Sequence, residues 1–153
     1  MEEFVFYLIV HLIFIALSAS DFLYREINSL IVYGLGIVGC IYQAVFNQNY
    51  IVIPVTIVLF VLVGILCAKD NFILIGGGDL DVGIAIFALL GNVFGIVDVI
   101  MYSATIGIIM FVCLYRKTEK AIPFVPCLYV GYVLSSFGIS ISQEIFNLCQ
   151  QLF

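Results

Sequence analysis

The organisation of this chain is decided by residues 73–90, which read ILIGGGDLDVGIAIFALL. In this stretch three glycines and a carboxylate, Gly76 to Asp79, separate two strongly apolar runs. A charge between such runs requires a partner or a function, because burying an isolated ionised group is costly. A second carboxylate, Asp21, follows another apolar run. We therefore hypothesise that Asp21 and Asp79 meet in the folded protein.

The composition predicts an integral membrane protein. The 153 residues are 65% hydrophobic and only 10% charged, with a mean hydropathy of +1.28, which is far above the range of soluble domains. The formal net charge is -5 and the sequence has no basic patch to neutralise phosphates, so nucleic-acid binding is not expected. The five cysteines are dispersed without a C-x-x-C pair, which argues against structural zinc and a disulfide framework.

Six apolar runs approach the ~20 residues needed to cross ~30 Å of hydrocarbon. The predicted fold is all-α, a single domain that forms a bundle of six transmembrane helices over residues 4–20, 30–46, 51–68, 80–97, 98–115 and 122–139. Residues 140–153 form a short tail for which an interfacial helix is one interpretation. A cleaved signal peptide is an alternative for the first run, but Glu2 and Glu3 stand where Lys or Arg is usual.

The basic residues give this bundle an orientation. All of the Lys and Arg residues follow the first, third or fifth predicted span: Arg25, Lys69, Arg116, Lys117 and Lys120. By the positive-inside rule these loops are cytoplasmic and the N-terminus lies outside. Both Asp21 and Asp79 are then expected at the cytoplasmic membrane surface.

Two carboxylates at the same depth predict acid and base chemistry. If they are adjacent, their repulsion favours one proton shared by the pair. The ionised Asp can activate a water and the protonated Asp can polarise a peptide carbonyl, as in an aspartyl protease. Gly76, Gly77 and Gly78 would let a substrate backbone approach closely. This chemistry requires no metal or cofactor.

Each acid also has a simpler explanation. Asp79 can be the N-cap of the fourth span, and Asp21 can pair with Arg25 at i+4. His11 lies near the middle of the first span, roughly 15 Å along the helix from Asp21. A neutral, hydrogen-bonded packing role for His11 is favoured over a catalytic one.

Other polar and proline residues leave alternatives open. Asp81 points to a different helix face from Asp79, which favours a solvated position or a pair with Lys69. Asp98 is expected near the turn between the fourth and fifth spans. Pro123 and Pro126 either start a helix cleanly or mark irregular backbone that lines a cavity and offers free amide groups to a substrate.

Three motifs in this order resemble the prepilin peptidase family, the GxGD-type membrane aspartyl proteases of bacteria and archaea that remove leader peptides from type IV pilin precursors. Residues 21–28, DFLYREIN, match the family's D-x-x-x-R-x-I-P-N pattern without its proline. Residues 76–79 match G-x-G-D, and residues 123–126, PFVP, match P-F-x-P. Asp81 stands where family members often have Lys. The likeness extends over nearly the whole chain.

The resemblance implies a function and its residues. It implies that Asp21 and Asp79 are catalytic and that six further residues shape the site: Gly76, Gly77, Gly78, Arg25, Pro123 and Pro126. The implied partners are a pilin-like precursor and the lipid bilayer of a bacterial or archaeal plasma membrane. The chain lacks the paired cysteines of the larger members' methyltransferase domain, so S-adenosylmethionine is not expected. The alternative function is a small transporter or scaffold whose acids bind protons or ions.

Overall fold

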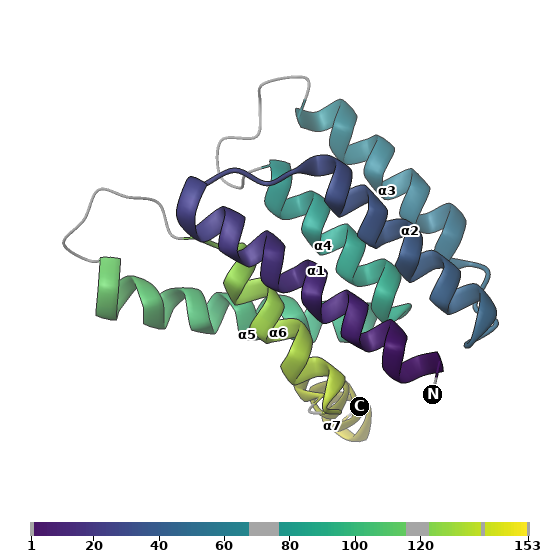
Figure 1. Ribbon diagram of the computed structural model, residues 1–153. Helices are drawn as coiled ribbons and strands as arrows, with labels where there is room; N and C mark the ends of the chain where they lie inside the picture. Colours follow the sequence, from purple (N-terminus) through teal and green to yellow (C-terminus); the bar gives the residue numbers. More distant parts are fainter. Residues whose placement is uncertain (1, 68–76, 116–122, 139, 153) are drawn as a thin grey trace.

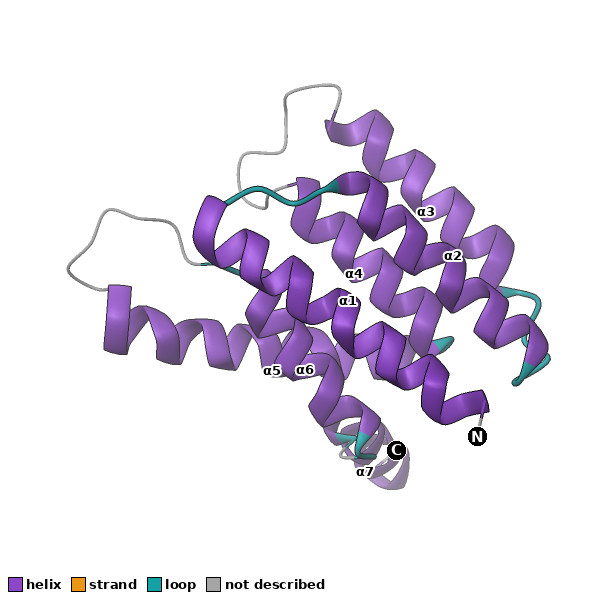
Figure 2. Ribbon diagram, in the orientation of Figure 1, coloured by secondary structure: helices purple, strands orange, loops and turns teal. Residues whose placement is uncertain are grey.

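The computed structural model describes residues 2–67, 77–115, 123–138 and 140–152. Every regular element in these ranges is helical, which confirms the predicted all-α class (Figure 2). In chain order the helices are α1 (Glu2–Tyr24), α2 (Ser29–Val45), α3 (Val52–Cys67), α4 (Gly77–Leu90), α5 (Val93–Met110), α6 (Val125–Ser136) and α7 (Ile141–Leu152). A π-helical turn, Phe111–Tyr115, continues α5.

Helix α4, which begins with the glycine and aspartate motif, lies at the centre of the bundle. It packs against α2, α3, α5 and α6, while α1 packs mainly on α6 (Figure 1). Helices α1 to α4 lie side by side, whereas α5 crosses them at a steep angle. The core joins buried side chains of five helices: Val10, Phe14, Leu17, Val32, Leu35, Val82, Ala85, Ile86, Leu89, Val99, Val125, Leu128 and Tyr132. The site motifs therefore rest on the best-packed part of the molecule.

The helix lengths and the outer surface indicate a membrane protein. Two segments, Glu3–Tyr24 and Val93–Cys113, are long and apolar enough to cross a bilayer, and the bent pair α6 and α7 would make a third if it acted as one span. Helices α2 and α3 are apolar but shorter. Large apolar side chains cover the outside, for example Leu30 at 80% and Ile51 at 73% exposure, as expected for a surface in contact with lipid.

The break between the fourth and fifth helices differs from the predicted boundary at residues 97 and 98. Helix α4 ends at Leu90, and Gly91 adopts a left-handed conformation with φ of +68° while its N–H donates to the carbonyl of Phe87. Asn92 then caps α5 by accepting from the N–H of Gly95. A glycine after the last turn followed by an asparagine cap ends one helix and starts the next, although the apolar run continues.

Asp98 consequently lies inside α5 and not at a turn. Its side chain is 1% exposed, and its two oxygens accept from the Ser140 hydroxyl and the Ser142 N–H, both at 2.8 Å. These donors stand at the beginning of α7, where free N–H groups favour a carboxylate. Asp98 therefore caps α7 from a neighbouring helix, and the tail helix anticipated for residues 140–153 is α7.

Close packing between α2 and α4 fixes the position of α4. A Cβ added to Gly39 of α2 would lie 2.8 Å from the carbonyl carbon of Ala88 and 2.8 Å from the nitrogen of Leu89. The Gln43 side chain, one turn further along α2, donates to the carbonyl of Leu89. The two backbones thus approach more closely than any residue larger than glycine would permit.

Candidate active site

The packing of α1 on α6 determines where Asp21 lies. Phe14 of α1 stacks with Tyr129 and Tyr132 of α6, with ring centroids 5.4 and 5.2 Å apart. His11 Nδ1 lies 3.1 Å from the Tyr129 hydroxyl, so His11 is a hydrogen-bonded packing residue, as predicted. Helices α1 and α6 run antiparallel to each other. Asp21, two turns beyond Phe14, therefore reaches the beginning of α6.

Asp21 is bound there by a backbone group. Its side chain is 7% exposed, and Oδ2 accepts a hydrogen bond from the N–H of Val125 at 3.0 Å. Val125 is the first residue of α6, where N–H groups have no partner within the helix. The bond and the positive end of the α6 dipole both stabilise negative charge on Asp21.

Asp79 occupies the first turn of α4, before the predicted fourth span, and interacts electrostatically with Asp21. Burial, and secondly the carboxylate of Asp21, raise the pKa of Asp79 from its ordinary value of 3.8 to about 6. The Val125 N–H donates to Asp21, whereas burial disfavours the ionised form of Asp79. At pH values near 6 Asp79 is therefore present in both its protonated and its ionised form, so that it can supply the acid beside a second carboxyl group.

The glycine turn packs against the loop that follows Asp21. A Cβ added to Gly78 would lie only 2.9 Å from Cδ1 of Ile27, so this position requires glycine or a shift of the Ile27 side chain. The structure thus brings together all three motif segments, namely the loop after α1, the beginning of α4 and the beginning of α6. Gly77 begins α4, whereas Gly76 lies outside the described residues.

Arg25 ends α1 with unusual backbone geometry. Its φ is +59°, in the left-handed region that normally favours glycine or asparagine, and its N–H donates to the Asp21 carbonyl at 3.1 Å. Asn28 then caps α2, its side chain accepting from the Leu30 N–H at 3.0 Å. The Arg-x-x-Asn part of the motif therefore makes the turn that carries Ile27 over Gly78.

The two prolines frame the amide that binds Asp21. Pro126 stands in the first turn of α6, where a missing N–H costs little, and Pro123 is buried just before the helix. The sequence left open that this segment offers free amides to a substrate, but the Val125 amide is bonded to Asp21. The donor at Val125 is a backbone N–H, which residue type does not distinguish. The sequence analysis therefore did not identify Val125 as a site residue.

An apolar cavity of about 320 Å³ adjoins Asp79. Side chains from α3, α4, α5 and α6 line it, together with Phe124 just before α6. Asp79 is the ionisable residue in this lining. Asp79, Gly83 and Phe87, spaced one turn apart along the same face of α4, form one wall.

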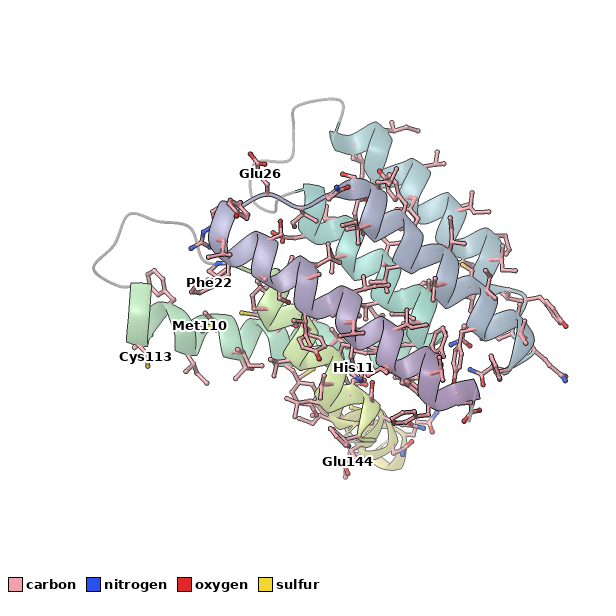
Figure 3. The ribbon with its side chains drawn as sticks, viewed as in Figure 1. His11, Phe22, Glu26, Met110, Cys113 and Glu144 are labelled. Carbon is pink, nitrogen blue, oxygen red and sulfur yellow. The ribbon has the colours of Figure 1, made fainter. Side chains whose placement is uncertain are left out.

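The remaining polar candidates lie apart from the pair or outside the described ranges. Figure 3 shows Glu26 on the loop after α1, directed away from the helices, and His11 further back along α1. The proposed partner of Asp81, Lys69, lies outside the described residues, as do the basic residues from 116 to 120. Within the described ranges no group of three or more His, Cys, Asp or Glu residues is arranged to hold a metal ion.

Comparison of the chain with protein-family models, curated proteins and solved structures finds no match. The family resemblance accordingly remains an expectation based on the three motifs.

Proposed function

We propose that the protein is a membrane aspartyl endopeptidase that removes the leader peptide of type IV pilin or pilin-like precursors at the cytoplasmic face of the membrane. The observation that carries the proposal is that the segments bearing Asp21 and Asp79 pack together at the beginning of α6, beside an apolar cavity. Asp79 is the third residue of α4 and not its N-cap, so capping does not account for this carboxylate. The motif resemblance adds the substrate class.

The two carboxyl groups take different roles in the proposed reaction. Asp21, ionised and held by Val125, accepts a proton from a water whose oxygen attacks the carbonyl carbon of the scissile peptide bond. Asp79 donates its proton to the carbonyl oxygen as negative charge develops there. Asp21 then returns its proton to the amide nitrogen, the C–N bond breaks, and a hydroxyl of the tetrahedral intermediate gives its proton back to Asp79, which restores both carboxyl groups. The products are one carboxylic acid and one amine, and no metal takes part.

The proposed orientation explains how such a substrate would meet the pair. A short basic leader stays in the cytoplasm while the apolar helix that follows it lies in the bilayer, so the cleavage site is at the membrane surface. Exposed Glu26 and half-buried Asp81 add negative charge near the site, which favours a basic leader.

The test is co-expression of the chain with pilin-like precursors, comparing the wild type with Asp21→Asn and Asp79→Asn. Loss of either acid or base function should reduce the cleavage rate by roughly 10²- to 10⁴-fold while both variants remain inserted. Glu144→Gln, which changes an exposed carboxylate on α7, is the matched control and should cleave normally. Normal cleavage by either aspartate variant would reject the proposal.

A second measurement separates the protease from a transporter or scaffold. Proton or ion movement through purified protein in sealed liposomes, lost in both aspartate variants and unaccompanied by cleavage, would favour the transporter. Chelator treatment should leave peptidase activity unchanged, because two carboxyl groups suffice for the reaction. Inhibition by a chelator and recovery with zinc would favour a metalloprotease.

A further inference from the structure

We infer that the cavity beside Asp79 binds the apolar membrane segment of the substrate, and that Gly83 is the residue that lets that segment approach α4. This inference rests on the proposed function, since it places the substrate of the same pair. It adds the location of the binding surface and a residue that determines which segments fit.

The geometry of α4 supports this location. Asp79 and Gly83 are separated by one helical turn and both line the cavity. A peptide chain whose scissile bond lies at Asp79 and which continues along α4 therefore passes over Gly83 and then Phe87. Apolar side chains of α5 and α6, including Ile96, Ile100 and Leu128, form the facing walls.

Packing within the protein does not account for Gly83. No atom lies within 4 Å of the position that a Cβ would take at Gly83, so alanine would fit without displacing anything. Glycine inside a helix is roughly 1 kcal/mol less favourable than alanine, and its usual justification is the close approach of another backbone. At Gly39 a neighbouring helix makes that approach. At Gly83 a bound segment would make it.

Two other helical glycines, Gly34 and Gly64, also have no atom near the position of a Cβ, but they lie on exposed faces of α2 and α3. Gly83 differs because it is partly buried and stands in the wall of a cavity, four residues from the ionisable carboxyl group. The exposed glycines therefore serve as controls for the loss of a helical glycine alone.

The cavity also defines the chemistry of the occupant. Its walls are hydrocarbon apart from Asp79, so side chains such as Leu, Ile or Phe would be favoured and charged side chains excluded. A volume of about 320 Å³ holds a small number of such side chains and not a whole helix. We expect the first turn or two after the scissile bond to be selected here, with the rest of the segment in lipid.

The experiment uses the full chain carrying Asp21→Asn, so that binding is measured without cleavage. The probe is a synthetic peptide with three lysines, a glycine and about 20 leucine and alanine residues, with one photoreactive leucine in the first apolar turn. After reconstitution in phospholipid vesicles and illumination, mass spectrometry should locate the cross-link at residues 83–87, Ile96, Ile100 or Leu128. Cross-links confined to lipid, or to α2, would overturn the inference.

A substitution series tests Gly83 directly. Gly83→Leu should weaken peptide binding by about 10- to 100-fold, the loss expected when one apolar side chain can no longer be buried. Gly83→Ala should give a smaller loss, and Gly34→Leu should bind like the parent. Equal affinity in Gly83→Leu and the parent would overturn the assignment. The cross-linking experiment uses a protein whose cavity is not mutated. It therefore locates the bound peptide even if a Gly83 variant folds poorly.

The outcomes also distinguish this inference from the proposed function. Suppose that peptide binding depends on Gly83 but the wild-type chain cleaves no precursor. This result would support the binding surface and reject the protease function. Suppose instead that cleavage depends on both aspartates but substitution of Gly83 leaves the peptide affinity unchanged. This result would support the protease function and reject the binding surface.

Discussion

Replacing Asp79 with asparagine is expected to make the protein more stable at neutral pH, although it should remove activity. The pKa of Asp79 lies at about 6 in the folded protein and at 3.8 for an ordinary carboxyl group. A raised folded-state pKa means that the folded protein binds the proton more tightly than the unfolded chain does. The resulting stability is complete below pH 3.8 and is lost as the pH rises through 6.

The size of the effect follows from the shift. Each pKa unit corresponds to about 1.4 kcal/mol, so a rise of about two units sets an upper bound near 3 kcal/mol on the destabilisation by ionised Asp79 at pH 7.5. Partial solvent exposure of the carboxylate reduces this to about 1–2 kcal/mol. Asparagine is uncharged and caps helices as well as aspartate does, so Asp79→Asn should recover that amount.

The assay is thermal unfolding of the full chain in detergent at pH 7.5 and at pH 4. Asp79→Asn should unfold at a higher temperature than the wild type at pH 7.5, and the difference should shrink toward zero at pH 4. Glu26→Gln, on the exposed loop, should show no such pH-dependent gain. A variant that is less stable than the wild type at pH 7.5, or a gain that is equal at both pH values, would refute the reasoning.

Two further substitutions test features that position the site. Arg25→Gly should be more stable than Arg25→Ala by about 1 kcal/mol in the same unfolding assay, because the left-handed backbone at residue 25 strains alanine but not glycine, while both variants lose the same side chain. Gly39→Ala should be destabilising by about 1–3 kcal/mol because its methyl group meets the backbone of α4. Gly34→Ala, at an exposed helical position, should be neutral or stabilising; an equal loss at both glycines would contradict the close-packing argument.

The helices with simple apolar runs were predictable from the sequence. The second and third runs begin and end within a residue or so of α2 and α3, because an uncharged polar turn separates them. The predicted boundary between the fourth and fifth spans at residues 97 and 98 is wrong, because apolar residues continue beyond Gly91 and the next charge in the sequence is Asp98. Backbone conformation at Gly91 and the Asn92 cap end the helix there, and hydropathy does not register either of them.

The sequence singled out the two candidate carboxylates but not the backbone groups and the glycine that surround them. Two carboxylates after apolar runs predicted Asp21 and Asp79, and their electrostatic interaction agrees with the hypothesis that they meet. The partner of Asp21 is a backbone N–H 104 residues away, which no side-chain pattern can identify. Gly83 likewise resembles any helical glycine until the space around it is known. Contacts of this kind depend on how the helices are aligned along one another. The packing of the whole core determines that alignment, and no single sequence motif reveals it.

The buried contact between Asp98 and the start of α7 has a consequence for how the chain is threaded through a membrane. Beyond Lys120 the sequence contains no Lys or Arg, so charge gives the last segment no preferred side. Asp98 lies near the beginning of α5 and joins the beginning of α7 to that end of the bundle. If the bundle spans the membrane as predicted, this bond would hold α7 at the end of the bundle opposite Asp21 and Val125. A reporter enzyme attached after α7 would therefore read out the sidedness of the whole bundle, and Asp98→Ala would make that readout ambiguous.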